Sequence, residues 1–73
     1  MVNLNRQFLI FLGKHIRNMR EQKNISQEEF GKMVGVHRTY VGMVERGEKN
    51  ITIFSLQKFA EALNLKVKDL IDF

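Results

Sequence analysis

The spacing of small and apolar residues in the segment 27–45 constrains the fold more than any other feature of the chain. Gly31 stands where two crossed helices would approach most closely, and a residue larger than alanine there would push them apart. Gly35 falls at the junction, where a chain leaving a helix commonly takes the left-handed conformation that glycine adopts freely. The apolar residues that could bury the inner faces of the two helices are Phe30, Val34, Val36, Val41 and Val44. The pattern predicts two short helices joined by a three-residue turn, 35–37.

Two stretches carry a resemblance to a known family. Residues 16–50 read IRNMREQKNISQEEFGKMVGVHRTYVGMVERGEKN, and residues 55–71 read SLQKFAEALNLKVKDLI. They resemble the Xre/Cro and phage-repressor type of helix-turn-helix domain, over roughly residues 12–71. Within that family, HRTYVGMVERGEKNITIFSL is most similar to the controller proteins of bacterial restriction-modification systems, which carry RTY near the start of the recognition helix and ERG before a basic, Asn-containing loop. The resemblance implies a lambda-repressor-like fold and a sequence-specific DNA-binding transcriptional regulator.

Periodicity and capping residues predict an all-α, compact five-helix bundle without strands. The expected helices cover about 5–22, 27–34, 38–45, 53–63 and 67–71. Ser26 and Glu29 have the spacing of a capping box, Thr52 is a second N-cap, and Asn64 tolerates the left-handed conformation that ends a helix. The residues expected to be buried on the first helix are Phe8, Leu9, Leu12, Ile16 and Met19. Those expected nearer the C-terminus are Leu56, Phe59, Ala60, Leu63 and Leu70.

The length of 73 residues predicts a single domain over 1–73. A core of this size gives marginal stability, which dimerisation would raise. The chain has no cysteine, which excludes disulfides and thiolate zinc sites and fits the cytosol. Its longest apolar run, 8–12, is far shorter than a membrane span, and the N-terminus lacks a signal-peptide pattern. We therefore expect a cytoplasmic protein with no membrane partner.

The charge distribution favours an anionic partner. The formal net charge is +4, although many soluble proteins reach such a value without binding any polyanion. Its placement is more informative, because Arg38, Arg46 and Lys49 lie in or just after the second helix of the 27–45 pattern. The acidic residues Glu21, Glu61, Asp69 and Asp72 lie outside this region. This asymmetry directs positive charge toward DNA.

Three residues are candidates for reading bases. Arg38 and Thr39 occupy the first exposed turn of the helix expected to enter the major groove. Arginine can donate two hydrogen bonds to guanine, and threonine offers a hydroxyl and a methyl group. Met43 lies one turn further on the same face, where a core position is nearly as well supported. Gly42 would permit either close approach to DNA or contact with a neighbouring helix.

Other residues are expected to hold the DNA backbone. In the resembling family, the glutamine that matches Gln27 clamps the backbone at the N-terminus of its helix, where the helix dipole favours a phosphate. His37 would cap its helix or, when protonated, contact a phosphate, and a capping or solvated role is better supported than metal binding because the only other histidine, His15, lies on a different expected helix. The remaining candidate backbone contacts are Tyr40, Arg46, Lys49 and Asn50, of which Lys49 has a solvated surface position as a strong alternative.

The resemblance also implies a structural ion pair between Arg20 and Glu45. It would tie the first helix to the end of the third, and leaving either group unpaired in a buried setting could cost several kcal/mol. Neither residue would then be free to bind DNA.

Dimerisation follows from the geometry of DNA recognition. One short helix reads too few base pairs, so such modules bind as two-fold dimers on half-sites about 34 to 36 Å apart, which implies a pseudo-palindromic operator. We expect the interface in residues 53–73, formed by Phe54, Leu65, Val67, Ile71 and Phe73. For Leu65 and Val67, completion of the monomer core is an equal alternative. Ile10 and Phe11 give a second candidate surface.

Other function classes are less well supported. No grouping of residues resembles a catalytic site, so no enzyme activity, cofactor, metal or small-molecule ligand is expected. An antitoxin-like protein-interaction module with the same fold remains an alternative, and a membrane-surface helix is a weaker one. RNA polymerase is a further candidate partner, because acids on the matching helix of phage repressors touch it. Glu28 and Glu29 lie in that region, although Lys32 weakens the analogy.

Overall fold

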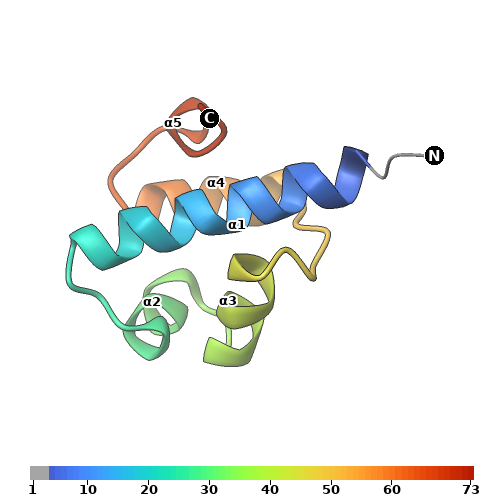
Figure 1. Cartoon of the computed structure of the whole chain (residues 1–73). Coiled ribbons are helices and arrows are strands. Elements are labelled where there is room, and N and C mark those ends of the chain that lie inside the picture. Colours follow the sequence, from blue (N-terminus) through green and yellow to red (C-terminus); the bar gives the residue numbers. More distant parts are fainter. Residues whose placement is uncertain (1–3) are drawn as a thin grey trace.

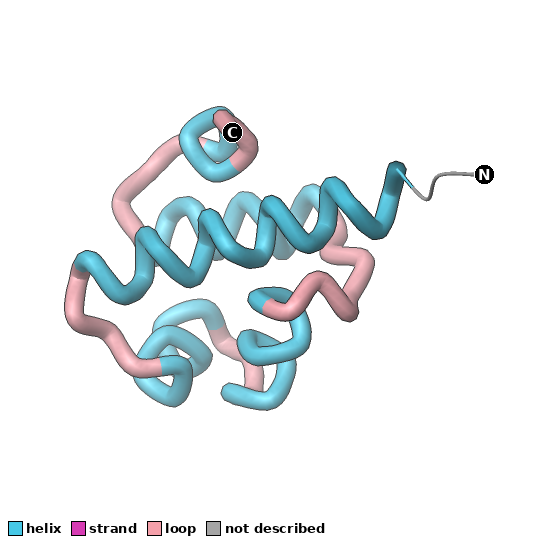
Figure 2. Tube along the Cα trace, in the orientation of Figure 1, coloured by secondary structure: helices cyan, strands magenta, loops and turns pink. Residues whose placement is uncertain are grey.

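The computed structural model describes residues 4–73, which form five helices and no strand (Figure 1). The helices are α1 (Leu4–Gln22), α2 (Gln27–Val34), α3 (Arg38–Glu45), α4 (Ile53–Ala62) and α5 (Val67–Leu70). Short loops join them, and in this view α4 lies behind α1, α5 above it and α2 and α3 below it (Figure 2). The predicted all-α fold class is confirmed, and each helix boundary lies within one residue of its expected place.

Capping groups fix where the helices begin and end. The Ser26 hydroxyl accepts a hydrogen bond from the backbone N–H of Glu29 at 3.0 Å, and the Glu29 carboxylate accepts one from the N–H of Ser26 at 3.0 Å. The Thr52 hydroxyl caps α4 by accepting from the N–H of Ser55 at 3.0 Å. Asn64 takes the left-handed conformation, with φ of 59°, after α4 ends. These caps satisfy N–H groups that a helix start leaves without partners.

The core is a single apolar cluster drawn from all five helices. Phe30 of α2 meets Phe59 of α4 edge-on, with ring centroids 5.1 Å apart. The buried hydrophobic residues are Leu12, Ile16, Phe30, Val34, Val41, Val44, Leu56, Phe59, Ala60, Leu63 and Leu70. The expectation that Phe8 is buried is wrong, because its side chain is 47% exposed. Its ring lies 5.3 Å from the ring of Phe73, which covers it only in part.

Two glycines allow close approach of the backbone, Gly31 to the turn between α2 and α3 and Gly13 to the end of α3. A Cβ at Gly31 would lie 2.6 Å from the carbonyl oxygen of Val36. Even alanine therefore does not fit, although the sequence pattern predicts that it is allowed at this position. Gly13, which the sequence reasoning did not single out, lies against the C-terminal end of α3. A Cβ there would meet the carbonyl oxygens of Val44 and Glu45. Backbone-to-backbone contact therefore holds α3 to α1.

Candidate nucleic-acid interface

The turn between α2 and α3 has the length and conformation that its sequence predicts. Gly35 has φ of 90°, and its N–H and that of Val36 both donate to the carbonyl of Gly31 at 2.8 Å. His37 then caps α3, because its Nδ1 accepts a hydrogen bond from the N–H of Thr39 at 3.0 Å. Helices α2 and α3 lie together on one side of α1, with α5 on the other (Figure 1). The outer face of α3 is thus left uncovered by the rest of the chain that the structure describes.

The candidate base-reading residues lie on this face. Arg38 and Thr39 are exposed in the first turn of α3, and Met43 is half-buried one turn later. Arg38 Nη1 donates to Glu28 Oε2 of α2 at 3.0 Å, a contact that the sequence reasoning did not anticipate. Both side chains are more than half exposed, so a pair of this kind contributes little stability and can open at small cost. Arg38 is therefore held beside α2 yet able to reach a ligand.

The candidate backbone contacts differ in their exposure. His37, Lys49 and Asn50 are exposed, whereas Tyr40 is half-buried and its ring stands edge-on to Phe59 at 6.3 Å. Arg46 is exposed and donates through Nε and Nη2 to the carboxylate of Glu48, at 2.8 and 3.2 Å. The hydrogen bonds within this pair raise the pKa of Arg46 and lower the pKa of Glu48, so the pair favours the charged form of each group.

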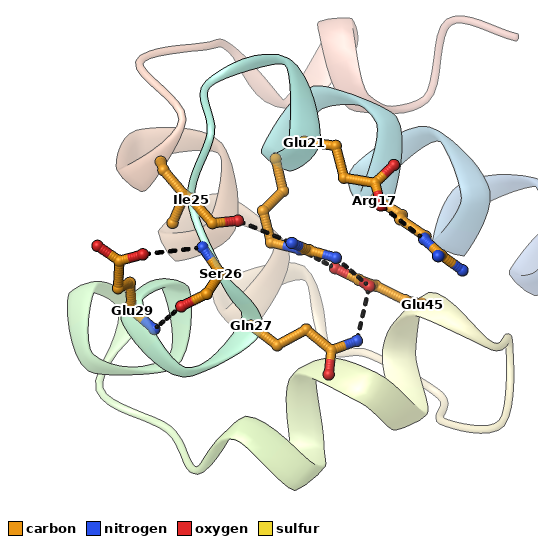
Figure 3. A network of polar contacts seen from close by, with 8 residues as sticks. Arg17, Glu21, Ile25, Ser26, Gln27, Glu29 and Glu45 are labelled. Carbon is orange, nitrogen blue, oxygen red and sulfur yellow. Dashed lines mark hydrogen bonds and ion pairs between the residues drawn. The ribbon is translucent and has the colours of Figure 1, made fainter.

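A buried polar network connects this surface to α1 (Figure 3). Arg20 donates through Nε and Nη2 to the Glu45 carboxylate, at 2.6 and 3.0 Å, and through Nη1 to the carbonyl of Ile25 at 2.7 Å. The side chains of Arg20 and Glu45 are only 8% and 3% exposed, so the ion pair that the resemblance implied is present and buried. The hydrogen bond to Glu45 is the main cause that raises the pKa of Arg20.

The network also involves Gln27, the first residue of α2. Its Nε2 donates to Glu45 Oε1 at 3.0 Å, and Figure 3 shows the amide reaching across to the carboxylate at the end of α3. This amide was expected to face a phosphate, and one of its two N–H groups is used within the protein. The second N–H is left for a ligand. One carboxylate thus joins α1, α2 and α3, which fixes the orientation of α3.

The expected dimer residues fall into two groups. Leu65 and Val67 are half-buried and pack against the core of their own chain, which is the alternative that the sequence left open. The other three are exposed, Phe54 by 63%, Phe73 by 53% and Ile71 by 42%. The Phe73 ring lies 5.3 Å from that of Phe8 and 6.0 Å from that of Phe11, both on α1.

Residues 4–73 contain neither a cluster of metal-ligating side chains nor a membrane-spanning helix. No group of three or more metal-ligating side chains occurs among these residues. None of the helices described is both long enough and apolar enough to cross a membrane.

Residues 16–70 match the model of the HTH_3 family, described as helix-turn-helix. The chain belongs to this family. Among relatives of this helix-turn-helix protein, control protein C.SmaI of Serratia marcescens is 43% identical over 60 residues, 82% of this chain and 71% of that protein. Control protein C.BamHI of Bacillus amyloliquefaciens is 37% identical over 65 residues, 88% of this chain and 80% of that protein.

A solved structure agrees with these relatives. The restriction-modification controller protein C.AhdI from Aeromonas hydrophila superposes on the helix-turn-helix protein with a TM-score of 0.83 at 37% identity. The match covers 85% of this chain and 94% of that one. The predictions of a helix-turn-helix transcriptional regulator and of its resemblance to controller proteins are confirmed.

Proposed function

We propose that the protein is a homodimeric controller that binds a pseudo-palindromic operator upstream of restriction-modification genes and regulates their transcription. The observation that supports this most is the outer face of α3, where exposed Arg38 and Thr39 stand on a helix held by buried contacts. A pre-positioned helix loses little conformational freedom on binding, which favours specificity. The controller proteins among its relatives supply the biological setting.

In this proposal α3 enters the major groove. Arg38, Thr39 and Met43 contact base edges, and Arg38 exchanges its partner Glu28 for an acceptor on a base. The backbone is held by Gln27, His37, Tyr40, Arg46, Lys49 and Asn50. These contacts set the register of α3 on the duplex without reading its sequence. The protein acts in the cytoplasm, without a catalytic role or small-molecule effector, and its concentration sets operator occupancy.

The dimer would form through the exposed apolar residues of the segment 53–73. Phe54, Ile71 and Phe73 carry this surface, and Phe8 and Phe11 extend it through their contacts with Phe73. Leu65 and Val67 support it from beneath, because they pack against the core. At low occupancy a promoter-bound dimer would offer Glu28 and Glu29 of α2 to RNA polymerase, and at high occupancy it would repress.

The test is a titration against the DNA upstream of the protein's own gene and against a scrambled duplex of equal length, at two salt concentrations. Arg38→Ala should abolish the preference for the upstream DNA. Arg17→Ala is the matched control, since Arg17 is an exposed arginine of α1 that pairs with Glu21 and is not among the residues proposed to contact DNA. It should keep that preference.

Three results would contradict the proposal in different ways. Equal and steeply salt-dependent binding to both duplexes would leave only a basic surface. Absence of DNA binding would favour the antitoxin-like protein-interaction module. Retention of specificity in Arg38→Ala would mean that other residues read the operator.

A further inference from the structure

Gly42 lies in the middle of α3, where glycine is unfavourable relative to alanine. Its backbone does not take a positive φ, so its conformational freedom does not explain its presence. The space above it is occupied instead. A Cβ at Gly42 would lie 3.0 Å from Arg46 Nη1 and 3.7 Å from both Nε2 and Oε1 of Gln27. Two polar side chains therefore lie over the bare backbone of α3.

Each of these side chains is oriented by a carboxylate. Arg46 donates to Glu48 through Nε and Nη2, which leaves Nη1 on the side toward Gly42. Gln27 donates one amide N–H to Glu45, which leaves the second N–H of the same nitrogen. The unused donors thus come from two different places in the chain, the start of α2 and the residue that caps α3, and both nitrogens lie within 3.7 Å of the position that a Cβ of residue 42 would take.

We propose that Gly42 is a positioning residue that lets Gln27 and Arg46 act as one clamp on a single DNA phosphate. This inference rests on the proposed function and goes beyond it, because the two residues would share a phosphate. Arginine makes strong, directional hydrogen bonds to phosphate oxygens, and the amide supplies a second donor without charge. The N-terminal end of α2 adds a dipole that favours the anion.

Gly42→Ala separates this role from a purely structural one. The added methyl group meets only the far end of a flexible side chain, so the fold accommodates it and the melting temperature rises by roughly several degrees, because alanine is the better helix former. Arg46 Nη1 is displaced in the same variant. Operator affinity should fall by about tenfold, as expected for one lost charge-assisted contact. The slope of log affinity against log salt should become shallower by about 0.9 per subunit.

Gly42→Ala is also compared in a protein that already carries Arg46→Ala. Without the guanidinium, the methyl of Gly42→Ala displaces nothing, so the Gly42→Ala, Arg46→Ala double variant should bind as tightly as Arg46→Ala alone. A further loss in the double variant would mean that the methyl meets DNA directly and would overturn the inference. Wild-type affinity in Gly42→Ala would overturn it as well.

A second double-mutant cycle, with Gln27→Ala and Arg46→Ala, keeps the inference testable if Gly42→Ala does not fold. Two groups that share one phosphate are energetically coupled, so Gln27→Ala and Arg46→Ala together should weaken binding by less than the product of their separate effects. Independent effects that multiply would show two separate contacts and overturn the inference. If the wild-type protein itself does not prefer its upstream DNA, the proposed function fails, and the inference fails with it.

Discussion

Glu45→Ala tests whether the buried network holds the fold together. The variant leaves the Arg20 guanidinium in a site where its side chain is only 8% exposed, with the carbonyl of Ile25 as its remaining acceptor. It also removes the acceptor of Gln27. Breaking a buried pair by removing one partner costs about 3 to 5 kcal/mol. Because a domain of this size rarely has more than about 3 to 5 kcal/mol of stability, we expect Glu45→Ala to be largely unfolded.

Glu21→Ala is the matched control, since it removes a glutamate from another helix and breaks the Arg17–Glu21 pair. Those side chains are 61% and 51% exposed, so the control should lose about 0 to 1 kcal/mol. Urea unfolding followed by far-ultraviolet circular dichroism measures both variants.

The double variant Arg20→Met, Glu45→Leu distinguishes an unpaired charge from lost packing. Replacing both charges with apolar side chains of similar volume is often neutral, so it should recover most of the stability that Glu45→Ala loses. If the free energy of unfolding of Glu45→Ala lies within about 1 kcal/mol of that of the Glu21→Ala control, the network does not have the structural role assigned to it.

Three further predictions concern the close approaches and caps. Gly31→Ala drives a methyl group against the Val36 carbonyl and should lower the free energy of unfolding by about 1 to 3 kcal/mol, and an unchanged urea midpoint would contradict that contact. Thr52→Ala removes the cap of α4 and should cost about 0.5 to 2 kcal/mol, measured in the same way; no loss would mean that the cap is not formed in solution. The hydrogen bond from the Ser26 N–H lowers the pKa of Glu29 below its ordinary value of 4.5, so its contribution is present above that pH and is lost as the pH falls through the folded-state pKa. The stability difference between wild type and Glu29→Gln should therefore shrink below about pH 4.5, and a difference independent of pH would contradict it.

Features set by neighbouring residues could be predicted from the sequence. The capping box of Ser26 and Glu29 and the left-handed Gly35 depend on contacts within a few residues, which spacing alone specifies. The helix boundaries and most of the core follow from the same local signals and from periodicity. The Arg20–Glu45 pair was accessible only through the resemblance, since 25 residues separate its members.

Features that depend on how helices cross could not be predicted. Gly13 shows its role only when α1 lies against the backbone of Val44 and Glu45, and nothing near it in sequence indicates that contact. The exposure of Phe8 depends on what packs against it in three dimensions, here the ring of Phe73, although its spacing fits the buried positions of the first helix. The ion pairs of Arg38 with Glu28 and of Arg46 with Glu48 could not be predicted either, because pairing at the surface depends on how the side chains are placed in three dimensions.

The most direct test of the central claim is to map where operator DNA contacts the isotopically labelled protein, by following backbone amide chemical shifts during a titration. If α3 binds DNA, the largest shifts should occur from Arg38 to Met43 in α3 and around Gln27. Little change is expected in the amides of residues 14–18 on α1. The largest shifts on α1 instead, with α3 unaffected, would contradict the claim that α3 binds DNA.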